Sequence, residues 1–384
     1  MKGTWKKIVS MSIAAVMSIC LLAGCSSGST GGSTEGTEKT GSNGESDGLT
    51  KVTFVSPTAL ESFDYLCIYA ADYLGYFEDE GLDVEYVEQM GSDDCKMLAA
   101  GTAQFAYPSP GVMLSSVDAG VTDIQAILNY DSIQIFGFAT NKDANIKDIN
   151  DLVGKEIASP AEATAAVISP VLDKAGIDPS EVTFITYGDS RYEAVSSGAT
   201  PALVTWLSEY YQLLGQGYDL DYIDGNEYAP QVSNSLCTSK TFAKENPETV
   251  NKFLRAFVKG MYFCYLNPEA AADITLLTCP NLEIDWDGAC GASVGDIKQI
   301  FGIEEEDMKK DVEDGIGLFD MEMCQMACDN LLSAGTLSNE IKAEDYYTNE
   351  YVEPIAESLD KATVEKDAES YECTSEAYKA SAAK

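Results

Sequence analysis

The stretch that decides the fold is GYFEDEGLDVE at residues 75–85, which joins a predicted helix to a predicted strand. Before it, apolar side chains recur at helical spacing over residues 63–74, and Gly75 ends that helix. After it, residues 84–87 form the second of two apolar strands, the first of which lies at residues 51–55. This order predicts two parallel strands with a helix packed across them.

The same alternation continues along the chain on the C-terminal side of this stretch. Helices alternate with further strands, which are expected at 104–107, 124–128, 133–139, 156–158, 182–187 and 202–205. This order predicts a mostly parallel sheet covered by helices on both faces. After residue 237 the pattern becomes helical, at 247–266, 268–277, 294–300 and 321–333. The acidic segment from Pro354 onward is either a terminal helix or a frayed tail.

The N-terminus has the pattern of an export signal. Three lysines precede an apolar run at residues 8–23, which is short for a membrane span. The run leads into LAGC at residues 22–25, which closely resembles a bacterial lipobox. We expect a lipoprotein signal peptide over residues 1–24 and a diacylated Cys25; the alternative is a plain signal peptide followed by an incidental cysteine. Residues 26–50 are mostly Gly, Ser and Thr and predict a flexible tether.

Composition excludes several classes of function. The 384 residues hold 24 Lys and Arg against 63 Asp and Glu, a net charge of -39. Such an acidic surface repels phosphate backbones, so no nucleic-acid partner is expected. The chain contains no histidine, which removes imidazole bases, Ser-His and Cys-His nucleophiles, and the commonest zinc ligand.

The cysteines give no clear pairing pattern. Nine follow Cys25, at positions 67, 95, 237, 264, 279, 290, 324, 328 and 373. An odd number cannot all pair within one chain. Bridges between Cys279 and Cys290 or between Cys324 and Cys328 stay open from the sequence. No metal site is expected, because Cys324 and Cys328 have no further ligands nearby in the sequence.

Three other segments accompany GYFEDEGLDVE. They read AAGTAQFA at 99–106, DLVGKEIA at 151–158 and AGIDP at 175–179. Together the four segments resemble the substrate-binding proteins of ABC importers, in the branch that handles nitrate, sulfonates, taurine and thiamine-pyrimidine precursors. The resemblance runs from about residue 51 to about residue 270.

The resemblance implies a periplasmic-binding-protein-like (type II) α/β fold, with two α/β lobes around a ligand cleft and a helical C-terminal extension. Lobe 1 would comprise residues 51–140 and 237–384, and lobe 2 residues 141–236. Hinges would lie near 137–142 and 232–237. The implied partners are a small-molecule ligand, an ABC permease with its ATPase subunit, and the outer face of the cytoplasmic membrane through the lipid anchor. No cofactor is implied, and the binding protein is expected to be a monomer.

Ligands of such folds bind where the carboxyl ends of strands from both lobes face the cleft. The loops at these positions supply the predicted ligand-binding residues, which are Pro57, Thr58, Ser62, Asp64, Tyr107, Ser109, Tyr130, Asp131, Ser159, Glu162, Thr164, Tyr187, Arg191 and Trp206. Each also has a structural alternative. Ser109 and Ser159 can serve a turn or a helix start, Asp64 can be a solvated acid at a helix start, and Trp206 can belong to the core.

The chemistry of these loops favours a neutral or cationic ligand. They contain several carboxylates and only one basic residue, Arg191, whereas a nitrate or sulfonate site needs cationic donors or several helix N-termini. Their aromatic side chains suit stacking on a flat heterocycle, such as a thiamine pyrimidine precursor. The alternative is a sulfonate, taurine or nitrate, because Ser56-Pro57 follows the first strand where pyrimidine-precursor binders usually carry Asp-Trp.

An enzymatic role is not expected. Gly291-x-Ser293-x-Gly295 matches the pattern of a nucleophile elbow, but without histidine it is interpreted as a glycine-flanked serine near a helix start. Fungal thiamine-pyrimidine synthases share the implied fold, yet that family requires an active-site histidine and a cysteine-rich iron motif, which this sequence lacks. A sensor or surface lipoprotein outside transport stays a further alternative.

Overall fold

The computed structural model describes residues 48–89, 93–160 and 164–383. The predictions for the signal peptide, for Cys25 and its tether, and for Glu162 lie outside these residues. Within them, no helix combines the length and apolarity needed to cross a membrane.

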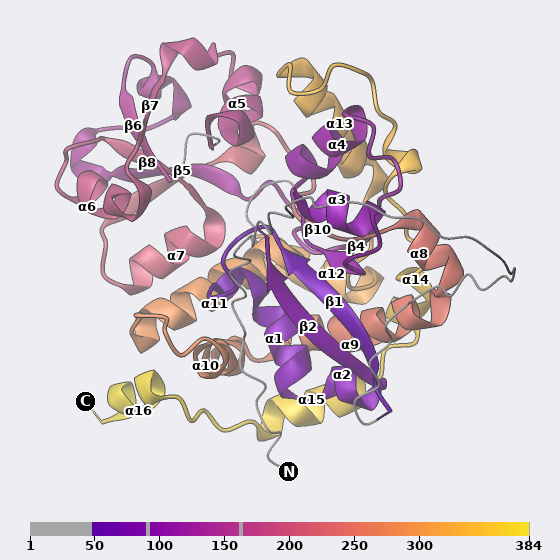
Figure 1. Ribbon diagram of the computed structural model, residues 1–384. Coiled ribbons are helices and arrows are strands. Elements are labelled where there is room, and N and C mark those ends of the chain that lie inside the picture. Colours follow the sequence, from indigo (N-terminus) through magenta and orange to yellow (C-terminus); the bar gives the residue numbers. More distant parts are fainter. Residues whose placement is uncertain (1–47, 90–92, 161–163, 384) are drawn as a thin grey trace, which may run out of the picture.

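Two five-stranded sheets form the centres of two lobes (Figure 1). In the first sheet the strands lie in the order β2 (Leu82–Glu88), β1 (Thr50–Ser56), β3 (Phe105–Ala106), β10 (Ser235–Thr238) and β4 (Gln125–Asn129). In the second the order is β7 (Thr183–Thr186), β6 (Glu156–Ser159), β8 (Ala202–Trp206), β5 (Phe136–Asn141) and β9 (Leu220–Asp224). The two sheets with their covering helices form the expected two-lobed α/β architecture.

Both sheets are mixed, so the prediction of a mostly parallel sheet is wrong. β1 is parallel to β2 and β3, and β6 is parallel to β7 and β8. β10 is antiparallel to β3 and β4, and β5 is antiparallel to β8 and β9. The physical reason is that β5 and β10 are the strands by which the chain enters one sheet directly from the other, without a helical crossover.

The chain passes between the sheets at 130–135, between β4 and β5, and at 225–234, between β9 and β10. The first predicted hinge, at 137–142, is therefore misplaced, because almost all of it is β5 and is hydrogen-bonded within the second sheet.

Helices cover the sheets. Those in the first two-thirds of the chain are α1 (Leu66–Tyr73), α2 (Tyr76–Asp79), α3 (Asp93–Ala99), α4 (Pro110–Asp118), α5 (Thr164–Lys174), α6 (Arg191–Ser196), α7 (Leu207–Gly215), α8 (Lys240–Glu245) and α9 (Pro247–Leu266). The remainder are α10 (Pro268–Thr278), α11 (Trp286–Phe301), α12 (Glu305–Asp314), α13 (Met321–Ser333), α14 (Glu353–Glu357), α15 (Lys361–Ser370) and α16 (Glu376–Ala382). Short 3-10 turns lie between them, including η1 (Phe63–Tyr65), η5 (Gly188–Ser190) and η6 (Gly225–Glu227).

The stretch at 75–85 forms the predicted turn from helix to strand. Gly75 and Gly81 have φ angles of 82° and 76°, in the left-handed region that glycine adopts without strain. Between them α2 buries Phe77, whose ring lies 4.9 Å from that of Phe253. β2 then pairs in parallel with β1, with Leu82 opposite Thr50, as expected.

The C-terminal region packs as helices on the first lobe rather than fraying. α15 lies along α9, where the hydroxyl of Tyr262 donates to Glu365 at 2.9 Å. Asp273 is buried in α10 and accepts hydrogen bonds from the Tyr371 hydroxyl and from the backbone N–H groups of Thr374 and Ser375. These bonds fix the turn that leads into α16.

The Gly-x-Ser-x-Gly run lies inside α11, not near a helix start as expected. α11 packs on α7 of the second lobe, and glycines let the two backbones approach closely. A Cβ added to Gly291 would lie 2.3 Å from the carbonyl oxygen of Tyr211, and one added to Gly295 would lie 2.5 Å from Cα of Ser208. Ser293 is buried and donates to the carbonyl oxygen of Pro268 at 2.7 Å. We call the close contact of α11 with α7 at Gly291 and Gly295 the glycine seam.

All nine cysteines in the described residues are free, and seven are buried. Neither pair that the sequence left open is bonded there. The buried thiols occupy core positions, as Cys67 and Cys264 do between α1 and α9.

Candidate functional site

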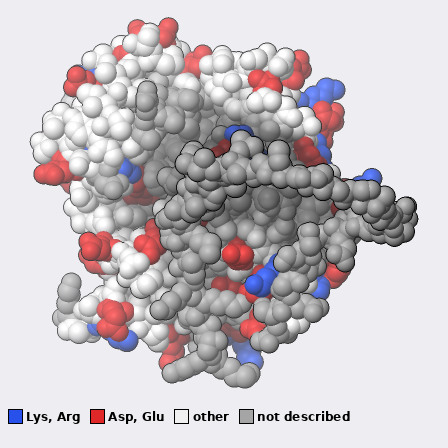
Figure 2. All heavy atoms as spheres, in the orientation of Figure 1, with Lys and Arg blue, Asp and Glu red and all other residues white. Residues whose placement is uncertain are grey.

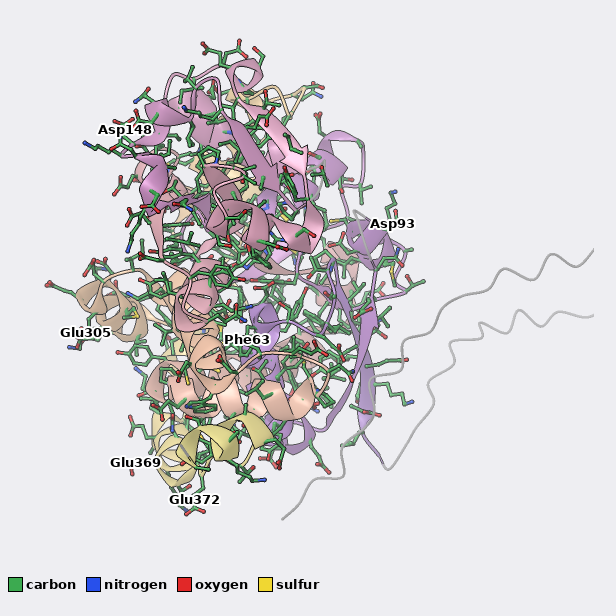
Figure 3. All side chains as sticks on the ribbon, turned by 90° about the vertical axis from the view of Figure 1, so that its left-hand side faces the viewer. Phe63, Asp93, Asp148, Glu305, Glu369 and Glu372 are labelled. Carbon is green, nitrogen blue, oxygen red and sulfur yellow. The ribbon has the colours of Figure 1, made fainter. Side chains whose placement is uncertain are left out.

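The two lobes meet where strands of both sheets end. Asp64 lies in η1, after β1, and Trp206 ends β8. The indole N–H of Trp206 donates to Asp64 Oδ1 at 3.2 Å, and the hydroxyl of Ser208 lies 3.4 Å from the same oxygen. Phe63, next to Asp64, lies at the level where the lobes adjoin (Figure 3). The structure thus brings two predicted residues from different lobes into contact.

Three further predicted residues lie beside Asp64. Tyr107 and Tyr130 form what we call the aromatic wall, and Asp131 is bonded to it. The hydroxyl of Tyr107 donates to Asp131 Oδ2 at 2.7 Å. The rings of Tyr107 and Tyr130 lie 4.9 Å apart at right angles, and Tyr130 stacks on Phe257 at 5.6 Å. Tyr107, Tyr130 and Asp131 are all buried. They follow β3 and β4, where the rule about strand ends expects cleft residues, and their role in ligand binding stays a prediction.

α11 contributes two residues that the sequence analysis missed. Asp296 accepts hydrogen bonds from the Tyr130 hydroxyl and from Gln299 Nε2, both at 3.2 Å. Gln299 Oε1 accepts from the backbone N–H of Ser208 at 2.7 Å. The segment 294–300 was identified only as a helix, and no strand-end pattern marks it as part of the cleft. Polar residues on an otherwise apolar helical face were the available signal.

Three carboxyl groups therefore share one buried region, and burial raises the pKa of each. The pKa of Asp131 rises to about 7, because desolvation and the nearby Asp64 charge outweigh the hydrogen bond from Tyr107. Burial also raises the pKa of Asp64, and burial together with Asp131 holds that of Asp296 well above its usual value. Among the described residues, no hydrogen-bond partner reaches Oδ1 of Asp131. This oxygen is an acceptor that the described fold leaves unused.

Arg191, the one basic residue predicted for the cleft, is held by an internal partner. Its guanidinium is buried and forms an ion pair with Glu209 of α7. It also donates to the carbonyl oxygen of Gly188 at 2.9 Å. Glu209 accepts from the hydroxyls of Tyr192 and Thr205 as well. Burial raises the pKa of Glu209 despite the opposing charge of Arg191. The cation is thus balanced within the second lobe.

Two predicted residues cap helices, which is the structural alternative given for Ser109. Ser109 begins α4 by accepting from the backbone N–H of Val112 at 3.4 Å. Ser62 begins η1 in the same way, accepting from Asp64 N at 3.2 Å.

The other predicted residues lie around the strand ends. Pro57 is half-buried, and the exposed Thr58 shares a hydrogen bond of 2.6 Å with the hydroxyl of Tyr65. Ser159 at the end of β6 and Thr164 at the start of α5 are buried. Tyr187, which follows β7, is 37% exposed.

The cavity beside the aromatic wall is small, about 10 Å³. It is lined by Phe54, Asp64, Tyr65, Ile68, Tyr107, Tyr130 and Phe257. This volume holds about one water molecule. The cavity is lined by residues of the first lobe and is too small for a nutrient-sized ligand.

A larger cavity of about 280 Å³ lies against the crossing segments. It is lined by Ser132, Ile133, Asn226, Phe301, Gly302, Ile303, Asp307, Lys310, Asp311 and Asp314. None of these was predicted to bind ligand. α12, which supplies its acidic side, projects from the body at Glu305 (Figure 3).

Comparison with known proteins agrees with this geometry. The sequence model of the family described as NMT1/THI5 like matches residues 62–271, more than half of the chain. The chain is 25% identical to the riboflavin-binding protein RibY of Chloroflexus aurantiacus, over 74% of this chain and 81% of the relative. It is 25% identical to the formylaminopyrimidine-binding protein of Halalkalibacterium halodurans, over 57% and 67%.

Two other similar proteins are named as a synthase and as a sulfonate-binding protein. The chain is 22% identical to 4-amino-5-hydroxymethyl-2-methylpyrimidine phosphate synthase of Legionella pneumophila, over 56% of this chain and 70% of the relative. Among solved structures, the putative periplasmic sulfonate-binding protein SsuA of Methylobacillus flagellatus superposes with a TM-score of 0.59. That match is 16% identical and covers 86% of this chain and 98% of the other. It shows the periplasmic-binding-protein-like fold.

Proposed function

This chain belongs to the NMT1/THI5-like family, and from that membership we propose that it is the substrate-binding lipoprotein of an ABC importer. It captures a small organic nutrient outside the cell and delivers it to the permease and its ATPase subunit. The nutrient is a neutral or cationic heteroaromatic compound, such as a thiamine pyrimidine precursor. Relatives named for binding riboflavin and formylaminopyrimidine support a solute-binding role and a heteroaromatic ligand.

The observation that carries the proposal is the contact between Trp206 and Asp64 across the two lobes. An aromatic ring from one lobe and a carboxylate from the other meet at the strand ends, next to the aromatic wall of Tyr107 and Tyr130. A flat ring system placed between the lobes can stack on these side chains while its N–H groups bond to the carboxylates. In the described part of the chain, the side chains that bond to Asp64 and Asp131 are neutral, so none of them supplies a cation for a sulfonate.

Binding requires the lobes to open and close. The cavity of about 10 Å³ is too small for a nutrient, so ligand enters an open form and the lobes then close over it. The crossing segments at 130–135 and 225–234 are the places where the chain can bend. The permease then recognises the closed form.

A binding role fits the chain better than catalysis. The sequence has no histidine, so it cannot supply the imidazole that the related synthases require. A sulfonate-binding importer subunit is the second candidate, favoured by the structural match to SsuA. A sensor on the same fold is the third.

The proposal is tested by a thermal-shift screen of the mature chain. The panel contains thiamine, its pyrimidine precursors, riboflavin, taurine, alkylsulfonates and nitrate. A ligand at 100 times its dissociation constant adds about 2.7 kcal/mol to the free energy of unfolding. A shift with a heteroaromatic compound is the expected result. Shifts with sulfonates alone replace the first candidate with the second, and no shift with any solute contradicts the importer role.

Trp206→Ala is expected to weaken binding of the heteroaromatic ligand by about 1–3 kcal/mol, because a stacking ring is lost. Trp206→Phe is the matched control, since it keeps a ring but removes the N–H that bonds to Asp64. Isothermal titration calorimetry measures both. Equal affinities for the wild type and the alanine variant would remove Trp206 from the site.

Cys25→Ala is expected to release the protein from the membrane, because the predicted lipid attachment is lost. Fractionation of cells into membrane and medium measures the change. Cys373→Ala, at a half-buried thiol far along the chain, is the control and should stay with the membrane. Retention of the Cys25→Ala variant would argue against lipidation.

A further inference from the structure

We propose that Glu209 is a specificity-determining residue of the ligand site. By neutralising Arg191 it withholds the nearest cation from the ligand, so that the cleft selects a cationic ligand over an anionic one. This inference rests on the proposed function and narrows its ligand to a positively charged heteroaromatic compound that also carries an N–H donor.

The first step is the position of the ion pair. Arg191 begins α6 after β7, and Glu209 lies in the first turn of α7 after β8. Both therefore stand at carboxyl ends of the second sheet, after β7 and β8, which β6 separates, on the side where the cleft lies. Arg191 is 3% exposed and Glu209 5% exposed. The pair is thus buried, and Glu209 is bonded to Thr205, the neighbour of Trp206 in β8.

The second step is the set of hydrogen bonds that hold the two terminal nitrogens of the guanidinium. Arg191 donates to Glu209, to the Tyr192 hydroxyl and to the carbonyl oxygen of Gly188. A sulfonate needs such a fork of N–H donors and would have to displace Glu209 to reach it. A carboxylate that is itself buried and bonded to Thr205 leaves its position only at a large cost.

The third step concerns the three buried carboxyl groups of the candidate site. Asp64, Asp131 and Asp296 have no cationic hydrogen-bond partner among the described residues. Their side-chain partners there are neutral, namely Ser62, Tyr107, Tyr130, Trp206, Ser208 and Gln299. Oδ1 of Asp131 is buried and lacks a partner within the same part of the chain. A cationic ligand with an N–H donor satisfies this oxygen through the donor, and its charge offsets the repulsion among the three acids.

The test compares charge selectivity in matched variants of the mature protein. Titration calorimetry measures the dissociation constants of thiamine, a heteroaromatic cation, and of benzenesulfonate, an aromatic anion. The wild type is expected to bind thiamine at least ten times more tightly. Glu209→Gln keeps the shape and removes the negative charge that balances the guanidinium, so it is expected to bind benzenesulfonate at least ten times more tightly than the wild type does. Glu193→Gln removes one exposed carboxylate of α6 and should change neither constant more than threefold.

An unpaired buried arginine can prevent folding, so a second variant keeps the inference testable. Arg191→Met combined with Glu209→Leu replaces the pair with apolar side chains of similar size. This double variant has no guanidinium and is expected to bind benzenesulfonate no better than the wild type. A gain of anion binding in the double variant overturns the inference.

Two other outcomes overturn it while leaving the importer role intact. One is a wild type that binds benzenesulfonate as tightly as thiamine. The other is a folded Glu209→Gln protein with unchanged selectivity. The importer role fails separately, if no solute of the broader panel shifts the wild type. The gain of anion binding in Glu209→Gln still decides the role of Glu209 in that case.

Discussion

Gly295→Val in the glycine seam is expected to lower the free energy of unfolding by about 3 kcal/mol. A Cβ at this position would lie 2.5 Å from Cα of Ser208 and 3.0 Å from the carbonyl oxygen of Leu207. Both neighbours are backbone atoms, which cannot rotate away as a side chain can. α7 and α11 must therefore separate, and the bond from Ser208 to Gln299 lengthens with them. Urea unfolding measures the loss.

Gly111→Ala is the matched control. Gly111 also lies in a helix, α4, but its added Cβ would meet nothing closer than Leu331 Cδ2 at 3.8 Å. Alanine is the better helix former, so stability is expected to stay equal or to rise by up to about 1 kcal/mol. Equal stabilities of the Gly295→Val and wild-type proteins would mean that the seam tolerates extra volume and that close backbone approach is not its function.

Asp131→Asn is expected to remove a pH dependence of stability and to abolish tight ligand binding. The pKa of Asp131 in the folded protein is raised to about 7, above that of an unfolded aspartate. The folded state therefore binds more protons between pH 4 and 7, and stability falls as the pH rises through this window. Between pH 5.5 and 7 this contribution amounts to about 2 kcal/mol. An asparagine does not ionise, so the variant lacks this part of the decline.

The measurement is urea unfolding of both proteins at pH 5.5 and at pH 8. Asp118→Asn is the control, because hydrogen bonds from Ser338 and Asn339 lower the pKa of Asp118, so its contribution to stability does not change between these two pH values. Its stabilising contribution is present above the pKa of an unfolded aspartate and is lost as the pH falls through the lowered value. Parallel pH curves for the wild type and Asp131→Asn would show that Asp131 ionises normally.

Local patterns in the sequence identify β1 to β8 but not β9 or β10, whose runs LDYID and SLCT mix polar and apolar residues. The helix, glycine and strand of residues 75–85 form as predicted. The direction of a strand is not visible in its local pattern. The antiparallel pairing of β5 and β10 depends on where the chain crosses between the sheets. No local pattern encodes that crossing.

The candidate site also contains residues that the sequence identifies and residues that only the folded structure brings to it. Asp64, Tyr107, Tyr130 and Trp206 follow strands, and the rule about strand ends places them together. Asp296 reaches the same region from a helix more than 150 residues later in the chain than Tyr130, through packing that only the folded structure brings about. The pairing of Arg191 with Glu209 is likewise a contact between two helices, and no local pattern in the sequence predicts it. Such contacts between distant elements set the charge of the cleft.

The acidic composition is visible on the face shown in Figure 2, where Asp and Glu side chains are spread over the lobes with few Lys or Arg among them. A surface of this kind keeps the protein soluble and slows the approach of anions. It therefore acts in the same direction as the interior charges that we propose select the ligand.

The free thiols mean that the described fold does not depend on the redox conditions around it. Exported proteins of modest stability commonly depend on cross-links that form only in an oxidising medium. Here the nine described cysteines are unlinked, and burial raises the pKa of thiols such as Cys237, so little reactive thiolate is present. Neither oxygen nor a reductant in the surroundings changes a bond on which the described fold relies. The described part of the chain thus relies on the same covalent structure in the presence and in the absence of air.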